Sequence, residues 1–299
     1  MGLDAPVFLV GPARSGSSLL YKSLCLHPQT AYVSNWVRRF PAAPQLAALN
    51  RAARALPATR RSTWFDDASN AYVYNSSRSL LHRAFPMAVE GEPMYGRCGI
   101  AELPMQRAAS RPDLGKLRRT IRTVMRTSGG SVFVNKRIAN NTRIPLLLEA
   151  FPGARFVFLV RDGRAVAYSL SRVDWWAEST VWWYGGTPGD WAREGKDPWV
   201  LCARNWVADL SSTEEGLLEV PPGQRLQLRY EDFVTSPMEH LQEVARFAGL
   251  PADRKWDDEL SRLSFPDRNE AWRTALDESV RDRVTAIQKP ELDRWGYDA

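Results

Sequence analysis

Cysteine, histidine and long apolar runs are all scarce in this 299-residue chain. The three cysteines are an odd number at wide spacing, so they form neither a disulfide framework nor a metal-binding motif. With three histidines and no cluster of histidines and carboxylates, the sequence presents no metal site. No segment approaches the ~20 apolar residues that span a bilayer, and the N-terminus lacks the basic region of a signal peptide. We therefore expect a cytoplasmic protein without a membrane partner.

Lysine is scarce as well, although the chain is basic. Only six of its 40 Lys and Arg residues are lysine, and the formal net charge is +6. Residues 36–126 hold 15 Arg and one Lys against six acidic residues, a local net charge of +10. Guanidinium groups bind phosphate, sulfate and carboxylate in a bidentate way, but a solvated basic face has the same composition. No basic helix carries interleaved aromatic residues, so nucleic acid is not expected as a partner.

Apolar residues make up 44% of the chain and aromatic residues 11%, which is typical of a globular protein with a sizeable core. Four short runs have the length and composition of strands, at 7–10, 131–134, 156–160 and 225–229. Helical patterns follow them, at 18–26, 142–150, 162–170, 236–249 and 279–287. The stretch Ser-Pro-Met-Glu at 236–239 is typical of a capping box. Strands that alternate with helices predict an α/β fold with a central parallel sheet flanked by helices.

The most informative segment lies between the first strand and the first helix. Residues 11–18, Gly-Pro-Ala-Arg-Ser-Gly-Ser-Ser, place Gly11 and Gly16 at the spacing of a Walker A loop. The backbone N–H groups of such a loop and the dipole of the following helix favour a bound phosphate. Walker A needs a lysine after the second glycine, whereas here Ser17 has that position and the basic residue is Arg14. The loop suits an anion but not ATP or GTP hydrolysis; the alternative is a turn that binds nothing.

Two further basic positions follow strands of the predicted sheet. Arg161 ends the third strand, and Ser169 lies eight residues on, about two helical turns along the next helix. Lys136 follows the second strand. Because the carboxyl ends of parallel strands meet at one edge of a sheet, Arg14, Lys136 and Arg161 should face the same crevice. Two anion-binding turns in one crevice indicate a nucleotide that is phosphorylated at two separate places.

Taken together, these motifs resemble the sulfotransferases that use 3′-phosphoadenosine 5′-phosphosulfate (PAPS). Residues 11–18 look like the loop that binds the 5′-phosphosulfate in that family, and Arg161 with Ser169 matches its 3′-phosphate motif. The run at 135–172 is similar to the tyrosylprotein sulfotransferases and their bacterial relatives. The stretch Arg-Tyr-Glu-Asp at 229–232 also fits the bacterial branch. Each motif is moderately specific, but they occur in order and on matching elements.

The resemblance implies a single P-loop-like domain over residues 1–299. Insertions at about 36–126 and 173–222 would shape the acceptor site. The implied activity is the transfer of a sulfuryl group from PAPS to a hydroxyl of a small-molecule acceptor, or less favourably to an amine. This in-line displacement would release adenosine 3′,5′-bisphosphate (PAP), and it would need no metal, because Arg and Lys can neutralise the charge.

The resemblance also implies roles for the matched positions. The donor would be bound by Gly11, Arg14, Ser15, Gly16, Ser17, Ser18, Arg161, Ser169, Tyr230 and Arg268. Within this set, Arg161 and Ser169 would bind the 3′-phosphate, and Arg268 would close over it. Arg14 would act as a catalytic residue that neutralises the sulfuryl oxygens and the leaving phosphate, and Lys136 would assist at the same centre.

The general base departs from the pattern of the family. Tyrosylprotein sulfotransferases carry a glutamate 21 residues after the loop arginine, and that count from Arg14 leads to Asn35, which is not a base at neutral pH. Glu90, Glu92 and His82 are the substitutes within the same part of the chain. A carboxylate within hydrogen-bond reach of the acceptor hydroxyl would suffice, and we take Glu92 as the catalytic base.

Two other functions are open at this point. A P-loop kinase-like phosphotransferase is disfavoured by Ser17 and by the lack of a clear Walker B carboxylate. A non-catalytic nucleotide- or polyanion-binding protein of the same fold is kept open by Asn35. The tryptophan-rich stretch at 175–206 also has two interpretations, an aromatic acceptor pocket or a cluster packed under a long insertion.

Overall fold

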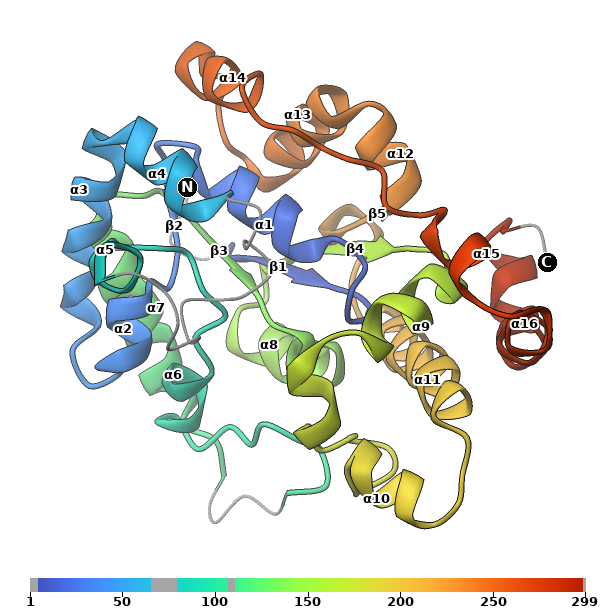
Figure 1. Ribbon diagram of the computed structural model, residues 1–299. Helices are drawn as coiled ribbons and strands as arrows, with labels where there is room; N and C mark the ends of the chain where they lie inside the picture. Colours follow the sequence, from blue (N-terminus) through green and yellow to red (C-terminus); the bar gives the residue numbers. More distant parts are fainter. Residues whose placement is uncertain (1–4, 66–79, 107–110, 298–299) are drawn as a thin grey trace.

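A sheet of five parallel strands in the order β2-β3-β1-β4-β5 forms the centre of the protein (Figure 1). The computed structural model describes residues 5–65, 80–106 and 111–297. The strands are β1 (Val7–Val10), β2 (Thr30–Ala31), β3 (Val132–Lys136), β4 (Arg155–Val160) and β5 (Arg225–Arg229). The predicted parallel α/β fold is confirmed. The two-residue β2 is the one addition among these strands, because so short an element leaves no periodic pattern in a sequence.

Helices cover both faces of this sheet (Figure 1). They are α1 (Ser17–Cys25), α2 (Asn35–Arg39), α3 (Asn50–Ala55), α4 (Pro57–Trp64), α5 (Leu80–Ala84), α6 (Glu92–Gly96), α7 (Leu114–Ser128), α8 (Ile144–Ala150), α9 (Gly163–Ser171), α10 (Pro188–Arg193), α11 (Pro198–Leu218), α12 (Tyr230–Thr235), α13 (Pro237–Ala248), α14 (Arg254–Leu260), α15 (Ala271–Ala275) and α16 (Glu278–Arg294). Short 3₁₀ turns are η1 (Pro44–Leu49), η2 (Ile138–Thr142), η3 (Asp174–Glu178) and η4 (Pro222–Gln224). In the described part of the chain, no helix has the length and apolar character needed to cross a membrane.

The core has two layers, because side chains alternate between the faces of each strand. Phe8 and Phe156 pack on one face with residues of α7, α8 and α11, whereas Leu9 and Val157 pack on the other with residues of α1, α13 and α14. All residues of β1 are buried. Burial on both faces explains why the central strands appear in the sequence as uninterrupted apolar runs.

The predicted helices are present, with one capping error. Asp162 caps α9, and Gly249 ends α13 in the left-handed conformation with φ +78°. The capping box at Ser236 is wrong, since the Ser236 side chain makes no cap bond. Its own N–H closes the end of α12 by donating to the Asp232 carbonyl at 2.9 Å. Ser236 therefore joins two abutting helices, and its backbone cannot take the extended form of an N-cap.

Helix α11 was not predicted, although it is the long helix that packs against α9 and α16 (Figure 1). It lies within the predicted insertion at 173–222, and only its first part belongs to the tryptophan-rich stretch at 175–206. Its buried face mixes apolar residues with Asn205, Asp209 and Thr213. Buried polar groups interrupt the periodic apolar pattern on which a helix prediction depends. The same polar groups turn out to contact the candidate site.

The carboxyl ends of all five parallel strands lie at one edge of the sheet, including those of the four predicted strands. β1 is paired on one side with β3 and on the other with β4. The order in which strands are added to the sheet therefore reverses at β1, which makes the end of this strand a topological switch point. Gly11 follows β1 with φ +134°, and a Cβ at this position would lie 2.2 Å from the Leu159 carbonyl oxygen. Only glycine can therefore bring the chain off β1 so close to β4.

We expect Gly11→Ala to lower the free energy of unfolding by about 3 kcal/mol or more, because the added Cβ collides with backbone that cannot move alone. Gly296→Ala is the matched control: Gly296 also has positive φ, at +68°, but a Cβ there meets open space. Its cost should be only the conformational one, about 1–2 kcal/mol. Urea unfolding measures both values, and equal losses would contradict the steric explanation.

Candidate active site

The loop at residues 11–18 joins β1 to α1 and is held by two buried side chains. The Gly11 N–H donates to Asn141 Oδ1 at 2.9 Å, and the Asn141 amide donates back to the Gly11 carbonyl at 3.0 Å. The Ala13 N–H donates to Asp209 Oδ2 at 3.3 Å. Both partners are 2% exposed. The first half of the loop is thus positioned by the fold itself.

The second half of the loop keeps donors available for an anion. Among the described residues, no acceptor bonds the N–H groups of Gly16 and Ser17, where α1 begins. Ser15 Oγ is fully buried and also lacks a partner in the described part of the chain. Gly16 has φ +83°, and a Cβ there would lie 2.5 Å from the Tyr230 ring. Unsatisfied donors at a helix N-terminus fit a phosphate or sulfate group.

Arg161 follows β4 and connects three parts of the chain. Its guanidinium donates to the Arg14 carbonyl at 3.1 Å, to Asn269 Oδ1 at 3.1 Å and to the Arg268 carbonyl at 2.5 Å. Its Cζ lies 4.4 Å from the centre of the Tyr230 ring. Burial lowers the pKa of Arg161, but a guanidinium stays protonated at any physiological pH. One buried cation therefore fixes the loop at residues 11–18 against the end of β5 and the C-terminal part of the chain.

The two predicted anion-binding turns are in direct contact. Arg14 has φ +66°, a left-handed conformation that is uncommon for a residue with a Cβ. Its Nε donates to Ser169 Oγ at 3.0 Å. The sequence analysis placed Arg14 at the 5′ end of a nucleotide and Ser169 at its 3′-phosphate, whereas in the structure the two side chains are hydrogen-bonded. A strained backbone at a charged loop residue is typical of functional positions.

Tyr230 and Arg268 contact this site in different ways. The Tyr230 ring packs between Gly16 and Arg161, and its hydroxyl donates to the Pro266 carbonyl at 3.3 Å. The side chain of Arg268 is exposed, so this residue reaches the site through its backbone carbonyl. Tyr230 therefore packs inside the candidate site, whereas the side chain of Arg268 lies at the protein surface.

Lys136, the last residue of β3, is buried and paired with Glu90. Its Nζ lies 2.5 Å from Glu90 Oε1, and Arg137 Nη1 lies 2.5 Å from Glu90 Oε2. Burial alone would raise the pKa of Glu90, but the charges and hydrogen bonds of Lys136 and Arg137 lower it to about 2. Burial lowers the pKa of Lys136; Glu90 opposes this, while Arg137 and Arg14 add to it. Glu90 thus remains an anion that fixes the lysine at the sheet edge.

Glu92, the predicted base, begins α6 and belongs to the same cluster. Its Oε1 accepts from Arg143 at 2.6 Å, and its Oε2 accepts from Arg143 at 3.1 Å and from Arg137 at 3.0 Å. Arg137 also pairs with Glu102. The structure therefore brings Glu90 and Glu92 together beside the end of β3, with every carboxylate bound by arginine or lysine.

Asn35, at the position of the glutamate in tyrosylprotein sulfotransferases, has a structural role here. Its Nδ2 donates to the carbonyls of Arg83 and Phe85 at 3.1 Å each, and its Oδ1 accepts from the Met87 N–H at 3.0 Å. A carboxylate cannot donate these two bonds. His82 lies in α5, in the segment that Asn35 holds in place. The amide thus explains why this position carries no acid.

One buried carboxyl group at the loop was missed by the sequence analysis. Asp209 of α11 accepts from the Ala13 N–H, from the Trp182 indole at 2.9 Å and from the Asn205 amide at 3.2 Å. Burial raises its pKa to about 6, although these three hydrogen bonds act in the opposite direction. A single aspartate in a helix gives no signal in the sequence, because its contact with Ala13 spans 196 positions.

The tryptophans at 175–206 mostly pack against other parts of the chain, as the second of the two sequence interpretations predicts. Trp191 is 5% exposed, and Trp206 is fully buried beneath the site. Trp182 and Trp183 are half-buried, and their indole N–H groups donate to side chains of α11. Trp175, in contrast, is 50% exposed. Most of these rings therefore pack on α11, and a minority face solvent.

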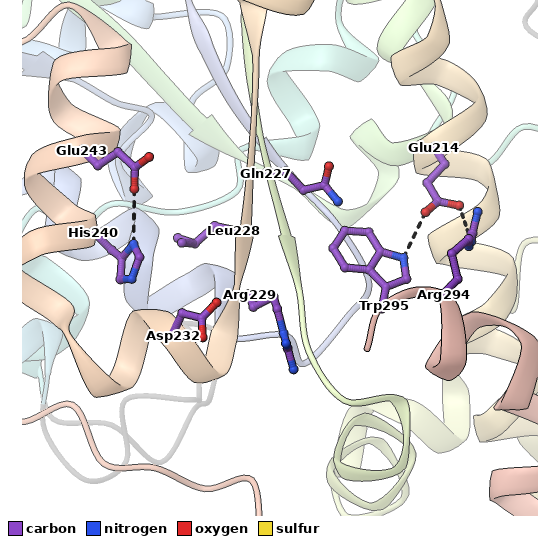
Figure 2. Close-up of a pocket in the computed structure, with 9 residues that line it drawn as sticks. All are labelled: Glu214, Gln227, Leu228, Arg229, Asp232, His240, Glu243, Arg294 and Trp295. Carbon is purple, nitrogen blue, oxygen red and sulfur yellow. Dashed lines mark hydrogen bonds and ion pairs between the residues drawn. The ribbon is translucent and has the colours of Figure 1, made fainter. Parts of the chain in front are cut away.

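A separate groove of about 610 Å³ runs along the outer edge of β5 (Figure 2). On one side of it, His240 Nδ1 of α13 lies 3.3 Å from Glu243 Oε2. On the other side, Glu214 of α11 accepts from Arg294 at 2.6 Å and from Trp295 at 3.1 Å. None of the residues predicted for the active site lines this groove. The groove is therefore distinct from the candidate site at the strand ends.

Comparisons with known proteins assign this geometry to a family. Residues 6–255 match the model of the sulfotransferase family. Carbohydrate sulfotransferase 3 of Tetronarce californica is 28% identical over 174 residues, which cover 51% of this chain and 38% of that protein. Omega-hydroxy-beta-dihydromenaquinone-9 sulfotransferase Stf3 of Mycobacterium bovis is 25% identical over 322 residues, which cover 99% of this chain and 76% of the relative.

Solved structures agree at the level of the fold. Sulfotransferase STF9 from Mycobacterium avium has a TM-score of 0.58 at 15% identity, over 98% of this chain and 77% of its own. The sulfotransferase domain from the curacin biosynthetic pathway has a TM-score of 0.51 at 15% identity, over 97% of this chain and 99% of its own. Because the family model matches most of the chain and the fold agrees, this protein belongs to the sulfotransferase family.

Proposed function

We propose that this sulfotransferase transfers a sulfuryl group from PAPS to a hydroxyl of a small-molecule acceptor, with PAP as the second product. The observation that carries the proposal is the contact between the two anion-binding turns. Arg14 bonds Ser169, and Arg161 bonds the Arg14 carbonyl. One crevice then offers donors to two separate phosphate groups of a nucleotide. The donor supplies an activated sulfuryl group, whose transfer needs positioning and charge neutralisation more than covalent help.

The residues present fit such a donor at both ends. The N–H groups of Gly16 and Ser17 and the buried hydroxyl of Ser15 would bind the 5′-phosphate end. Arg161 and Ser169 would bind the 3′-phosphate. A guanidinium has five N–H donors, and those of Arg161 make three bonds to the described residues, so further donors remain for phosphate oxygens. This second anion site would select PAPS over nucleotides that lack a 3′-phosphate.

Charge neutralisation is the role we assign to Arg14 and Lys136. Lys136 is fixed by Glu90 before any substrate binds, so its charge needs no reorganisation during the transfer. The charge of Arg14 also helps to lower the pKa of Lys136, so the two cations interact, which supports a shared centre. The absence of the Walker lysine at Ser17 disfavours the alternative of a kinase-like phosphotransferase.

The acceptor would bind beside the carboxylate cluster, where two segments approach each other. One segment is residues 100–106, which include Glu102, paired with Arg137, and Met105. The other contains Gly185, which lies close to Met105: a Cβ added at this glycine would be 3.6 Å from Met105 Cε. Met105 is 45% exposed. An exposed apolar side chain near a charged cluster suits an acceptor with an apolar body and a hydroxyl end. The two relatives, a carbohydrate sulfotransferase and an omega-hydroxy-beta-dihydromenaquinone-9 sulfotransferase, also support hydroxyl acceptors.

The acceptor proton requires a base on this side, and we keep Glu92 in that role. Its carboxyl group lies in the cluster that borders the proposed acceptor region, where its side chain is 18% exposed. Glu90 is less suited, because the charges around it lower its pKa to about 2. A base so weak would take little part in proton transfer near neutral pH.

The proposal is tested by incubation with radiolabelled PAPS and a panel of hydroxyl acceptors or a cell extract. We expect label in an organic product and release of PAP.

Lys136→Ala should reduce transfer by about 10²- to 10³-fold and still bind PAP. Lys289→Ala is the control: it removes a surface lysine paired with Asp293 and should be active. Tight binding of ATP with Mg²⁺ and no response to PAPS would instead indicate a phosphotransferase. PAP binding without transfer would indicate a non-catalytic protein.

Arg161→Ala should weaken the binding of PAP by about 10- to 100-fold, because charge-assisted hydrogen bonds to the 3′-phosphate are lost. Adenosine 5′-phosphate, which lacks that group, serves as the matched ligand and should lose much less affinity. Titration calorimetry gives both dissociation constants. Equal losses for the two nucleotides would show that Arg161 acts only by holding the loop.

Glu92→Gln should reduce kcat by about 10²- to 10⁴-fold, because the acceptor proton loses its base. Glu102→Gln is the matched control, since it removes a different carboxylate from the same arginine. Thermal melting checks that both variants fold. If Glu90→Gln rather than Glu92→Gln causes this loss of kcat, the base is Glu90.

A further inference from the structure

Helix α11 connects the donor loop with the tryptophan-bearing segment at 181–186. Trp206 of this helix donates its indole N–H to the Arg161 carbonyl at 3.1 Å. One turn further on, Asp209 accepts from the Ala13 N–H at 3.3 Å and from the Trp182 indole at 2.9 Å. A single carboxyl group therefore bonds the loop with one oxygen and Trp182 with the other.

Asp209 holds this position without a cationic partner. It is 2% exposed, and among the described residues no Lys, Arg or His forms an ion pair with it. Its three hydrogen-bond donors, which come from Ala13, Trp182 and Asn205, are all neutral. Burial of an unpaired charge is unfavourable, and here the charge also lies beside a loop suited to anions. If this position served packing alone, a neutral side chain would be more favourable there than an aspartate.

The geometry explains why the residue is nevertheless a carboxylate. Oδ2 accepts two bonds, from Ala13 and Asn205, while Oδ1 accepts the indole N–H. An asparagine offers one acceptor oxygen, and its NH₂ group would face one of these donors. A leucine would leave the Ala13 and Trp182 donors buried and unsatisfied. Only an aspartate can bond the loop and the indole together at this position.

We propose that Asp209 is a positioning residue that couples occupancy of the donor loop to the position of Trp182 and its segment at 181–186. The inference rests on the proposed function. An anion bound at the loop fixes Ala13, and the shared carboxylate passes this constraint to the indole. Coupling between two sites is reciprocal, so an ordered Trp182 in turn improves donor binding. Because Gly185 of this segment approaches Met105, the coupling reaches the border of the proposed acceptor region.

The test uses PAP as the probe and titration calorimetry as the measurement. Trp182→Phe keeps the aromatic ring but removes the N–H that Asp209 accepts, and Trp182 makes no hydrogen bond to the loop. It should nevertheless weaken PAP binding by about fivefold or more. Asp209→Asn should weaken it at least as much. The double variant should bind PAP no worse than Asp209→Asn alone, because both changes break the same connection.

Trp183→Phe is the matched control. Trp183 is the neighbouring half-buried indole and donates to Asn205 Oδ1 of the same helix at 3.1 Å, but not to the carboxylate that bonds the loop. Its PAP affinity should stay within about twofold of the wild type. Hydrogen exchange at 181–186 gives a second readout. PAP should slow exchange there in the wild type and in Trp183→Phe, but not in Asp209→Asn.

The outcomes separate this inference from the proposed function. If the wild type does not bind PAP, the proposed function fails first. If the wild type binds PAP but Trp182→Phe behaves like Trp183→Phe, the coupling does not exist. A lower melting temperature of Asp209→Asn with unchanged PAP affinity and unchanged exchange would likewise overturn the proposal, because it would reduce Asp209 to a structural residue. Non-additive losses with altered exchange support it.

Discussion

The candidate active site depends on the bonds of one buried cation, Arg161. Its guanidinium bonds the Arg14 carbonyl in the loop and Asn269 in the C-terminal part of the chain, and it stacks on Tyr230 at the end of β5. A buried guanidinium is costly unless its donors are satisfied, so these segments must assemble around it for the charge to be tolerated. The parallel sheet brings the strand ends together, and Arg161 then fixes the loop relative to them.

The parts of the site that follow strands could be predicted from the sequence. The loop at 11–18, Lys136 and Arg161 all come after apolar runs of strand length, and a parallel sheet gathers such ends at one edge. Helix α11 and Asp209 could not be predicted in this way. Buried polar groups interrupt the apolar face of α11, and the Asp209 contact with Ala13 joins residues 196 positions apart. Contacts of this kind depend on tertiary packing and leave no local pattern.

Asn35, Glu90 and Glu92 show how neighbouring residues decide which side chain a position can carry. Asn35 needs both a donor and an acceptor to hold residues 83–87, so a carboxylate would not serve there. Acidic residues occur instead at Glu90 and Glu92, each bound by surrounding cations. The ends of the strands therefore carry fixed charges of both signs before substrate arrives. Such preorganised charge suits a transfer in which negative charge moves between oxygens.

The groove beside β5 has a consequence for the behaviour of the protein at high concentration. Among the described residues, β5 is the last strand of the sheet, so its outer backbone groups pair with no neighbouring strand of that part of the chain. Exposed edges of this kind are templates for amyloid-like stacking. Here the strand is short, with Arg225 exposed at one end, Gln227 exposed in the middle and the half-buried Arg229 at the other end. Because an intruding chain would have to dehydrate these polar side chains, the edge resists strand-by-strand aggregation.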